Sequence, residues 1–212
     1  MTLNSNTVKA DPEGNHKLGS ALREHRKALN LSLKDVAEKA GLSVGFISQV
    51  ERDIVSPSLS SLASIAKTLE TDISHFFSQP HDDSIYTRNR KRAQYSLNHK
   101  GLSYERLSTS FPGSVINSVI MHELPGHKSE SIQHEGEEFF YILDGSLNII
   151  IEGEETELET GDSIHFDSSR EHSAWNHTDK TTTILHVCTM DVFGDKQALK
   201  KIPSINVGHK GV

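Results

Sequence analysis

The sequence predicts an α + β chain of two domains, a small bundle of five helices followed by an antiparallel β-barrel. Two observations support this prediction. Over the first third of the chain, apolar residues recur at the three- and four-residue spacing of helices that face a core. From about Gln94 onward, that period gives way to short β-rich runs separated by Gly, Pro, Asp and Asn. Such runs are typical of an antiparallel sandwich or small barrel.

Composition divides the chain into five segments. We expect a disordered N-terminal tail because the first residues are polar and lack periodicity. A basic run from Arg88 to Arg92 is interpreted as a solvated linker or strand, with an auxiliary contact to phosphate as the alternative. The expected segments are a tail over 1–15, a helical domain over 16–78, a linker over 79–93, a β domain over 94–192 and a loose tail over 193–212.

Charge and cysteine content limit the classes of protein that fit. The chain has 212 residues and a net charge of −7. Residues 1–80 hold nine basic and nine acidic residues, so the whole excess of negative charge lies in residues 81–212. The single cysteine, Cys188, excludes an intramolecular disulfide and is typical of a reducing cytosol. We find no signal peptide and no apolar run near the roughly twenty residues of a membrane span. We therefore expect a cytoplasmic protein without a membrane partner.

The helical domain is organised around residues 31–59, which are predicted to form two short helices joined by a tight turn. Ser32 and Asp35 make a capping-box pattern at the start of the first helix. Gly41 ends that helix, where a residue with positive φ is usually needed, and Ser43 can cap the next one.

Three more helices complete the predicted bundle. An amphipathic helix beginning at Leu18 precedes the two short helices. An apolar stripe from Leu59 to Leu69 predicts a core-facing helix after them. Asp72 can then cap a last turn that includes Phe76.

The second short helix presents small, amide-bearing and basic side chains on its outward face. This composition suits the major groove of DNA, where Gln can bond bidentately to adenine while Ser and Arg hold phosphate. A plain helical bundle is the alternative, but it needs no such face. The residues expected to contact DNA are Lys34, Ser43, Val44, Gly45, Ser48, Gln49 and Arg52.

A local basic patch lies in the same domain and would supply the phosphate contacts. Such a small patch provides few contacts per subunit, which favours binding as a dimer and a strong dependence on salt. The patch consists of Lys17, Arg23, Arg26, Lys27 and Lys34.

This stretch resembles the helix-turn-helix of the phage-repressor (XRE, Cro/C1-type) family over roughly the first third of the chain. The resemblance implies a lambda-repressor-like fold and a double-stranded DNA operator. It also implies a homodimer, with a tetramer left open, that places its recognition helices about 34 Å apart. Leu33 departs from the family, which often has a phosphate-contacting Gln there. The matching residues are Ala37, Gly41–Ser43, Ile47–Ser48, Glu51–Arg52, Pro57–Leu59, Leu62, Ile65–Ala66 and Leu69.

The β domain is predicted to enclose a pocket. Alternation from Glu138 puts Phe140 on the same face, and alternation from His172 puts Asn176 there. If both strands line one barrel, these groups and His134 converge on a mostly apolar interior, as expected of a small-molecule site. The predicted strands are Tyr104–Leu107, Val115–Leu124, Glu138–Leu143, Leu147–Ile151, Ser163–Phe166, His172–Asn176 and Thr182–Cys188.

Two segments of this domain resemble the signature motifs of the cupin superfamily, over roughly residues 85–190. The resemblance implies a double-stranded β-helix. Three residues depart from the motifs: Ile132 occupies the position of the first His, and Asp167 and Ser169 replace Pro and Gly. The matching residues are Gly126, His134, Glu138 and Gly145 in the first motif, and Gly161, His172 and Asn176 in the second.

The resemblance implies a metal site of three His and one Glu, of which His134, Glu138 and His172 are present. Two His and a carboxylate can still hold zinc, iron, manganese or nickel, with water in the open positions. Because Ile132 replaces one ligand, the alternative is a metal-free pocket in which these groups hydrogen-bond an organic ligand. The expected ligand-binding residues are Ile132, His134, Glu138, Phe140, His172 and Asn176. Candidates to replace the missing ligand are His122, His127, His165 and His186, for each of which a surface or satisfied core role is the alternative.

The string from Ile132 to Glu138 is similar to the variant first motif of helix-turn-helix cupin repressors that control the use of small amines, such as putrescine, or of amino acids and peptides. On this resemblance, Glu138 would pair with a ligand ammonium group and Phe140 would add a cation–π contact. The sequence thus predicts a repressor of a catabolic or transport operon that responds to a small polar effector and is not an enzyme. Two alternatives are a DNA-binding protein whose cupin serves only dimerisation, and a metal-dependent cupin enzyme fused to a DNA-binding domain.

Overall fold

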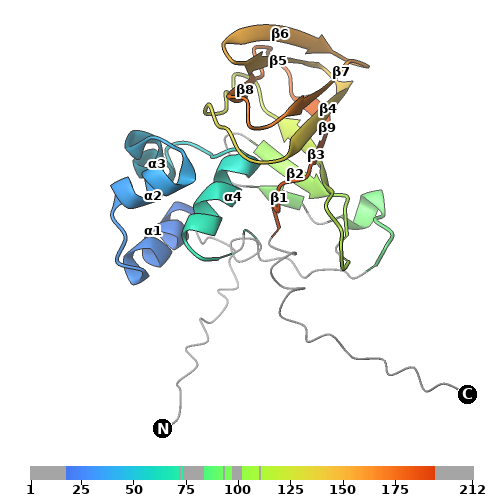
Figure 1. Cartoon of the computed structure of the whole chain (residues 1–212). Coiled ribbons are helices and arrows are strands. Elements are labelled where there is room, and N and C mark those ends of the chain that lie inside the picture. The colour runs from blue at the N-terminus through green and yellow to red at the C-terminus, as the bar shows by residue number, and fades with distance from the viewer. Residues whose placement is uncertain are drawn as a thin grey trace, which may run out of the picture.

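The computed structural model describes residues 18–71, 73, 84–92, 94–96 (backbone), 102–109 and 111–193, and these form a helical bundle beside two antiparallel sheets (Figure 1). The described residues contain four α-helices, whereas the sequence predicted five. The fifth, expected from Asp72, lies outside the described residues except for Ile73. The predicted N-terminal tail lies outside the described residues, and so does the predicted C-terminal tail except for Phe193, which is buried. The helices are α1 (Leu18–Ala28), α2 (Leu33–Ala40), α3 (Val44–Val50) and α4 (Leu59–Thr68).

The helix boundaries follow from local capping chemistry. Ser32 Oγ accepts the Asp35 N–H at 3.1 Å, and the Asp35 carboxylate accepts the Ser32 N–H at 2.7 Å, which confirms the predicted capping box of α2. Gly41 ends α2 at φ +70°, a conformation that costs glycine little. Ser43 Oγ accepts the Phe46 N–H at 3.0 Å and so caps α3 as predicted.

Gly19 lies where α1 meets the end of α3. A Cβ at Gly19 would be 2.7 Å from the Glu51 carbonyl oxygen and closer still to that of Val50, and both atoms belong to the backbone. The Gly19 N–H also donates to the Asp53 carboxylate at 2.9 Å, which fixes the approach of the two helices.

Replacing Gly19 by alanine is therefore expected to lower the free energy of unfolding by about 1–3 kcal/mol, because backbone atoms cannot move aside as side chains do. Urea denaturation followed by circular dichroism measures this change. The control is Gly45→Ala in α3, where the nearest atom is 3.9 Å away and the free energy of unfolding should rise by up to about 1 kcal/mol. Equal stability of Gly19→Ala and the native chain would contradict the prediction.

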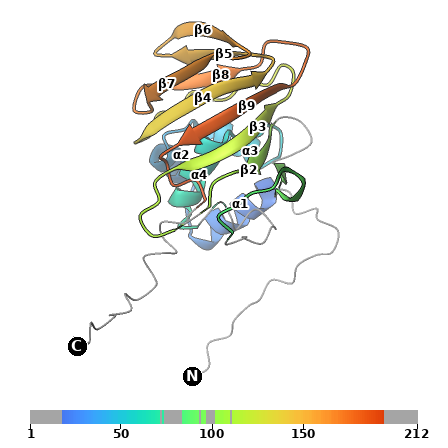
Figure 2. The same cartoon turned by 90° about the vertical axis from the view of Figure 1, so that its right-hand side faces the viewer.

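The described strands form a six-stranded sheet in the order β1-β2-β3-β9-β4-β7 and a three-stranded sheet in the order β6-β5-β8, with antiparallel neighbours throughout. Figure 2 shows β3, β9 and β4 side by side, in agreement with this order. All seven predicted strands are present within two residues of their predicted ends. The strands are β1 (Gln94–Ser96), β2 (Leu102–Arg106), β3 (Asn117–Glu123), β4 (Glu137–Asp144), β5 (Ser146–Ile151), β6 (Glu154–Glu159), β7 (Ser163–Asp167), β8 (His172–Trp175) and β9 (Thr182–Cys188).

The prediction of a closed barrel is wrong for the described residues, which form two separate sheets. The segment beside β8 contributes only two isolated bridges, Lys128 to Trp175 and Ile132 to His172, in place of a full strand. The two sheets still face each other across an interior, so the layers needed for a cavity are present.

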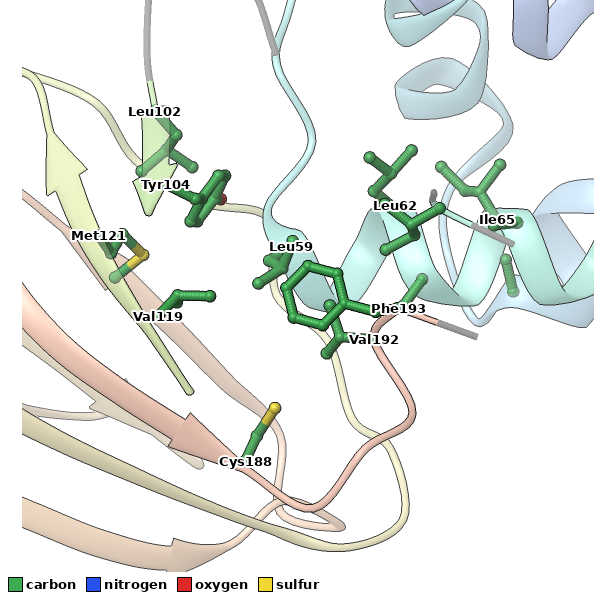
Figure 3. Packing of buried hydrophobic residues seen from close by; sticks show 14 of the residues in the cluster. Leu59, Leu62, Ile65, Leu102, Tyr104, Val119, Met121, Cys188, Val192 and Phe193 are labelled. Atoms are coloured by element: carbon green, nitrogen blue, oxygen red, sulfur yellow. The ribbon is translucent and has the colours of Figure 1, made fainter. Parts of the chain in front are cut away.

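The helix α4 joins the bundle to the larger sheet. One cluster of buried apolar residues runs through both parts of the molecule. Leu62 and Ile65 are fully buried in α4, while Leu59 at its start lies between Tyr104 of β2 and Phe193 (Figure 3). The helical bundle is thus packed directly on the β domain. None of the described helices has the length and apolar character that a membrane crossing requires.

Candidate functional site

The outward face of α3 carries the side chains that the sequence predicted to read DNA. Ile47 and Val50 are buried, so the opposite face of the helix points away from the core. Val44 is 45% exposed, and the Arg52 Nε–H donates to the Ser48 carbonyl at 3.0 Å. Of the predicted residues, Ser48 is half-buried and the exposed ones are Lys34, Ser43, Val44, Gly45, Gln49 and Arg52.

Arg26, which the sequence grouped in the basic patch, is bound within the domain. Its Nε and Nη2 donate to the two carboxylate oxygens of Glu51 at 2.6 and 2.8 Å, and its Nη1 donates to the Leu31 carbonyl at 2.9 Å. The hydrogen bonds that Arg26 donates to Glu51 raise the pKa of Arg26. This guanidinium therefore holds α1 to the end of α3, and Arg23 and Lys27 remain exposed in the patch.

The predicted basic run near residue 90 surrounds a short 3-10 turn, Asn89–Lys91. Arg88, Arg90 and Lys91 are exposed, which agrees with the solvated interpretation of this segment. Arg92 differs, because its Nη1 lies 3.4 Å from the Glu105 carboxylate.

A cavity of about 50 Å³ lies between the two sheets and the first turn of α4. Such a volume has room for a few water molecules. Its walls are mostly apolar, with a few polar groups from both layers. The lining residues are Ser58, Leu59, Ser60, Leu102, Met121, Glu123, Ser129, Ile132, Glu138, Phe140, Ile149, Phe166, His172, Ser173, Ala174 and His186.

Glu138 is the most densely contacted polar group of the cavity and is 2% exposed. Its Oε1 lies 3.0 Å from His134 Nε2 and 3.6 Å from His186 Nε2, and its Oε2 lies 3.6 Å from His172 Nε2. Ser60 Oγ of α4 donates to the same Oε1 at 2.9 Å. Burial alone would raise the pKa of Glu138, but the three histidines together outweigh it and hold this pKa well below its usual value. The carboxylate is therefore ionised inside an apolar interior.

Hydrogen bonds on the far side of two imidazoles fix which nitrogen faces the carboxylate. His172 Nδ1 donates to the Arg170 carbonyl at 2.8 Å, and His134 Nδ1 donates to the Glu135 carbonyl at 3.1 Å. Each Nε2 therefore faces Glu138, where it needs either a proton or another cation between itself and the carboxylate. Burial alone would lower the pKa of His134, but the hydrogen bonds to Glu138 and to the Glu135 carbonyl, with the charge of Glu138, together outweigh it and raise this pKa.

The same three side chains fit a divalent metal. The ligand atoms of His134, Glu138 and His172 all lie within 4.8 Å of one another. Their Nε2 atoms and the carboxylate are the donor set expected for such an ion, and the Nδ1 hydrogen bonds orient the rings as in metal sites. Ile132 is buried and lines the cavity as an apolar group. The structure thus brings together three candidate ligands.

Of the four histidines proposed as replacements for the missing ligand, His186 is the one that points inward. It is buried on β9, and its ring stacks on Phe140 with centroids 4.6 Å apart. Its Nε2 has no hydrogen-bond partner among the described residues. The others contact carboxylates elsewhere, in the pairs His122–Glu105, His127–Glu123 and His165–Glu137.

Two of the predicted ligand residues lie outside the lining of this cavity: His134, which contacts Glu138 and lines a neighbouring cleft, and Asn176. Asn176 is fully buried, but the lining of the cavity, as far as the chain is described, does not include it. Its side-chain amide donates to the carbonyls of Glu123 and Lys180, each at 2.8 Å, and its Oδ1 accepts the Thr178 N–H at 3.0 Å. Asn176 therefore holds the loop that follows β8.

Glu123 is a cavity residue that sequence reasoning missed. It is 1% exposed on β3, its Oε1 lies 2.9 Å from His127 Nδ1, and its Oε2 has no hydrogen-bond partner among the described residues. Desolvation by burial raises the pKa of Glu123. The alternation of β3, which also buries Val119 and Met121, was the available signal.

We expect Glu123→Gln to gain stability over the native chain as the pH rises. A carboxyl whose pKa is higher in the folded than in the unfolded state contributes stability below its unfolded pKa of about 4.5 and loses it as the pH rises toward the folded value. Glutamine has no such penalty. Urea denaturation of both chains at pH 4 and pH 7.5 measures the difference, and an advantage that shrinks between these values would contradict the prediction.

Comparisons with known proteins cover both parts of the chain. Residues 22–76 match the helix-turn-helix family model, and residues 119–188 match the cupin-domain model. The transcriptional regulator PuuR of Escherichia coli K12 is 29% identical over 178 residues, which cover 82% of this chain and 96% of that protein. The regulator SutR of the same organism is 26% identical over 166 residues, which cover 77% and 89%.

A solved structure has the same two-part fold. The crystal structure of an HTH_3-family transcriptional regulator from Vibrio cholerae matches with a TM-score of 0.52 at 22% identity. The match covers 82% of this chain and 95% of that one.

Proposed function

We propose that this chain, which matches the helix-turn-helix and cupin-domain family models, represses a catabolic or transport operon under the control of a small polar metabolite. The predictions of a DNA-binding regulator and of a ligand-sensing cupin are confirmed. Control by a small polar metabolite is supported by one observation: the same chain carries an ionised, buried Glu138 in a cavity and an exposed recognition helix, α3. In this proposal, residues 16–78 bind DNA, 79–93 form the linker and 94–192 sense the effector.

We propose that the chain binds a two-fold symmetric DNA operator as a homodimer. This binding would take place in the cytoplasm. Gln49 would read a base in the major groove, while Ser43, Ser48, Arg52 and Lys34 would hold phosphates. Val44 and Gly45 would allow the close approach of α3. The exposure of this face supports the proposal, since a helix that packed on its own domain through these residues could not enter the groove.

The effector proposed here carries an ammonium group that pairs with Glu138. A fixed negative charge within apolar walls favours a small cation, and Phe140 lies beside it as an aromatic face. A divalent ion held by His134, Glu138 and His172 would supply a Lewis-acidic centre at the same place. We propose a sensor and no enzyme, since the named relatives are regulators and Ile132 removes one family ligand.

Fluorescence anisotropy of an operator, selected from random duplex DNA with the full chain, tests the proposal. Amines, amino acids and dipeptides are added in turn, and an effector is expected to weaken operator binding about 5- to 150-fold, which corresponds to a coupling of about 1–3 kcal/mol. Retained operator binding with no response to any of them would favour a cupin that serves only dimerisation. Turnover that depends on bound metal would favour the fused enzyme.

A further inference from the structure

The first turn of α4 forms one wall of the cavity. Ser58, Leu59 and Ser60 line it, and among the described residues they are its only lining from the helical bundle. Every other lining residue belongs to a strand or to the loop that bridges to β8. The candidate effector site is therefore shared between the part of the chain that reads DNA and the part that senses.

Two carboxylates of the β domain hold this wall in place. Ser60 Oγ donates to Glu138 at 2.9 Å. The backbone N–H and the Oγ of Ser58 both donate to Glu130 Oε1, at 3.0 and 2.9 Å. Leu59 lies between these contacts and packs against Tyr104 (Figure 3).

The cavity volume requires a wall to move before an organic effector can enter. Small-molecule sites usually measure about 300–1,000 Å³, whereas this cavity measures about 50 Å³. The strand walls are held by continuous ladders, and the loop wall is held to β8 by backbone hydrogen bonds of Ser129 and Ile132. The α4 wall is held to the β domain by the hydrogen bonds of Ser58 and Ser60 to two carboxylates, together with apolar packing. An ammonium group that takes Glu138 Oε1 also competes with Ser60 for that oxygen.

We propose that the first turn of α4 is the movable wall of the effector site, so that ligand entry displaces α4 from the β domain. This inference rests on the proposed function and adds the route by which the effector acts. Ile65 of α4 and its C-cap residue Leu69 line a small gap inside the helical bundle together with Leu22 of α1 and Ile47 of α3, so a displaced α4 carries α3 with it. Ligand entry into the cavity would thereby change the orientation of the recognition helix α3.

Amide hydrogen exchange of the full chain tests the contacts that hold the wall. We expect the amides from Leu62 to Ile65 to exchange about 2- to 10-fold faster in Ser60→Ala and in Glu130→Ala than in the native chain, because each change removes hydrogen bonds that hold the wall. The matched control is Ser64→Ala, which alters a serine of the same helix that is not part of the cavity lining and borders a larger cleft between α4 and residues 133–136 and 189–191. Unchanged exchange in both test variants would overturn the proposal.

A side chain that fills the cavity acts as a permanent occupant and tests which wall moves. Ala174 lines the cavity from β8, and Ala174→Phe adds a ring that about 50 Å³ cannot hold. Exchange in the first turns of α4 should then rise at least as much as in Ser60→Ala, while β5 and β8 stay protected. Faster exchange in β5 or β8 with α4 unchanged would overturn the proposal. Ile132→Phe, a smaller addition to the same cavity, replaces this variant if it does not fold.

Operator titration of the same variants separates this inference from the proposed function. Faster exchange in α4 together with weaker operator binding supports both. Faster exchange with unchanged operator affinity overturns the coupling and leaves the regulator intact. Failure of the native chain to bind any duplex overturns the proposed function, while the exchange results still decide whether α4 is the movable wall.

Discussion

Gln49→Ala is expected to lower operator affinity about 30- to 10⁴-fold. A bidentate contact between Gln and adenine contributes about 1–3 kcal/mol of discrimination, and a homodimer makes the contact twice on a symmetric operator. The free energy of unfolding should stay within about 0.5 kcal/mol of the native value, because Gln49 is exposed and its removal leaves no cavity. Fluorescence anisotropy at one fixed salt concentration measures the loss, since phosphate contacts make affinity strongly dependent on salt.

The matched control is Gln133→Ala, which removes the same exposed side chain from the β domain. Its operator affinity should equal that of the native chain. A second comparison uses operators changed at one base pair, where Gln49→Ala should lose discrimination at a single position of each half-site. If Gln49→Ala lost the same affinity for every operator sequence, Gln49 would contact phosphate and no base. If Gln49→Ala bound the operator with native affinity, α3 would be excluded as the recognition helix.

Local chemistry made much of the fold predictable. The caps at Ser32 and Ser43 and the turn at Gly41 depend on residues within a few positions of one another, so sequence alone shows them. Period-two alternation correctly predicted that Glu138 and Phe140 share the buried face of β4. The strand β6 was missed because five of its six residues are acidic or polar and only Leu158 is buried.

Contacts between residues far apart in the sequence could not be predicted. Charge counting placed Arg26 in a basic patch, but its partner Glu51 lies 25 positions away and becomes visible only in the folded domain. The hydrogen bond from Ser60 to Glu138 spans 78 positions and depends on how α4 packs on the sheets. His186 was one of four equivalent candidates until the pairing of β9 with β4 placed it beside Glu138.

Two neighbouring carboxylates of β4 allow the role of burial to be measured directly. Glu138 lies 3.0 Å from His134, and Glu137 lies 3.0 Å from His165, so the two pairs have the same separation. The side chain of Glu138 is 2% exposed and that of Glu137 is 63% exposed. Removing one partner from a buried, hydrogen-bonded charge pair leaves the other groups without compensation, whereas water replaces a lost partner at the surface.

Glu138→Ala is therefore expected to lower the free energy of unfolding by about 3–5 kcal/mol and the Tm by about 6–20 °C. Glu137→Ala, the control, should change the free energy by less than about 0.5 kcal/mol. Both are measured by urea and thermal denaturation in buffer with EDTA, so that bound metal does not add to the stability of the native chain. A similar loss of unfolding free energy in both variants would mean that water solvates Glu138 as well as it solvates Glu137. The cavity would then be open to solvent, and an ionised carboxylate there would no longer select for a cationic effector.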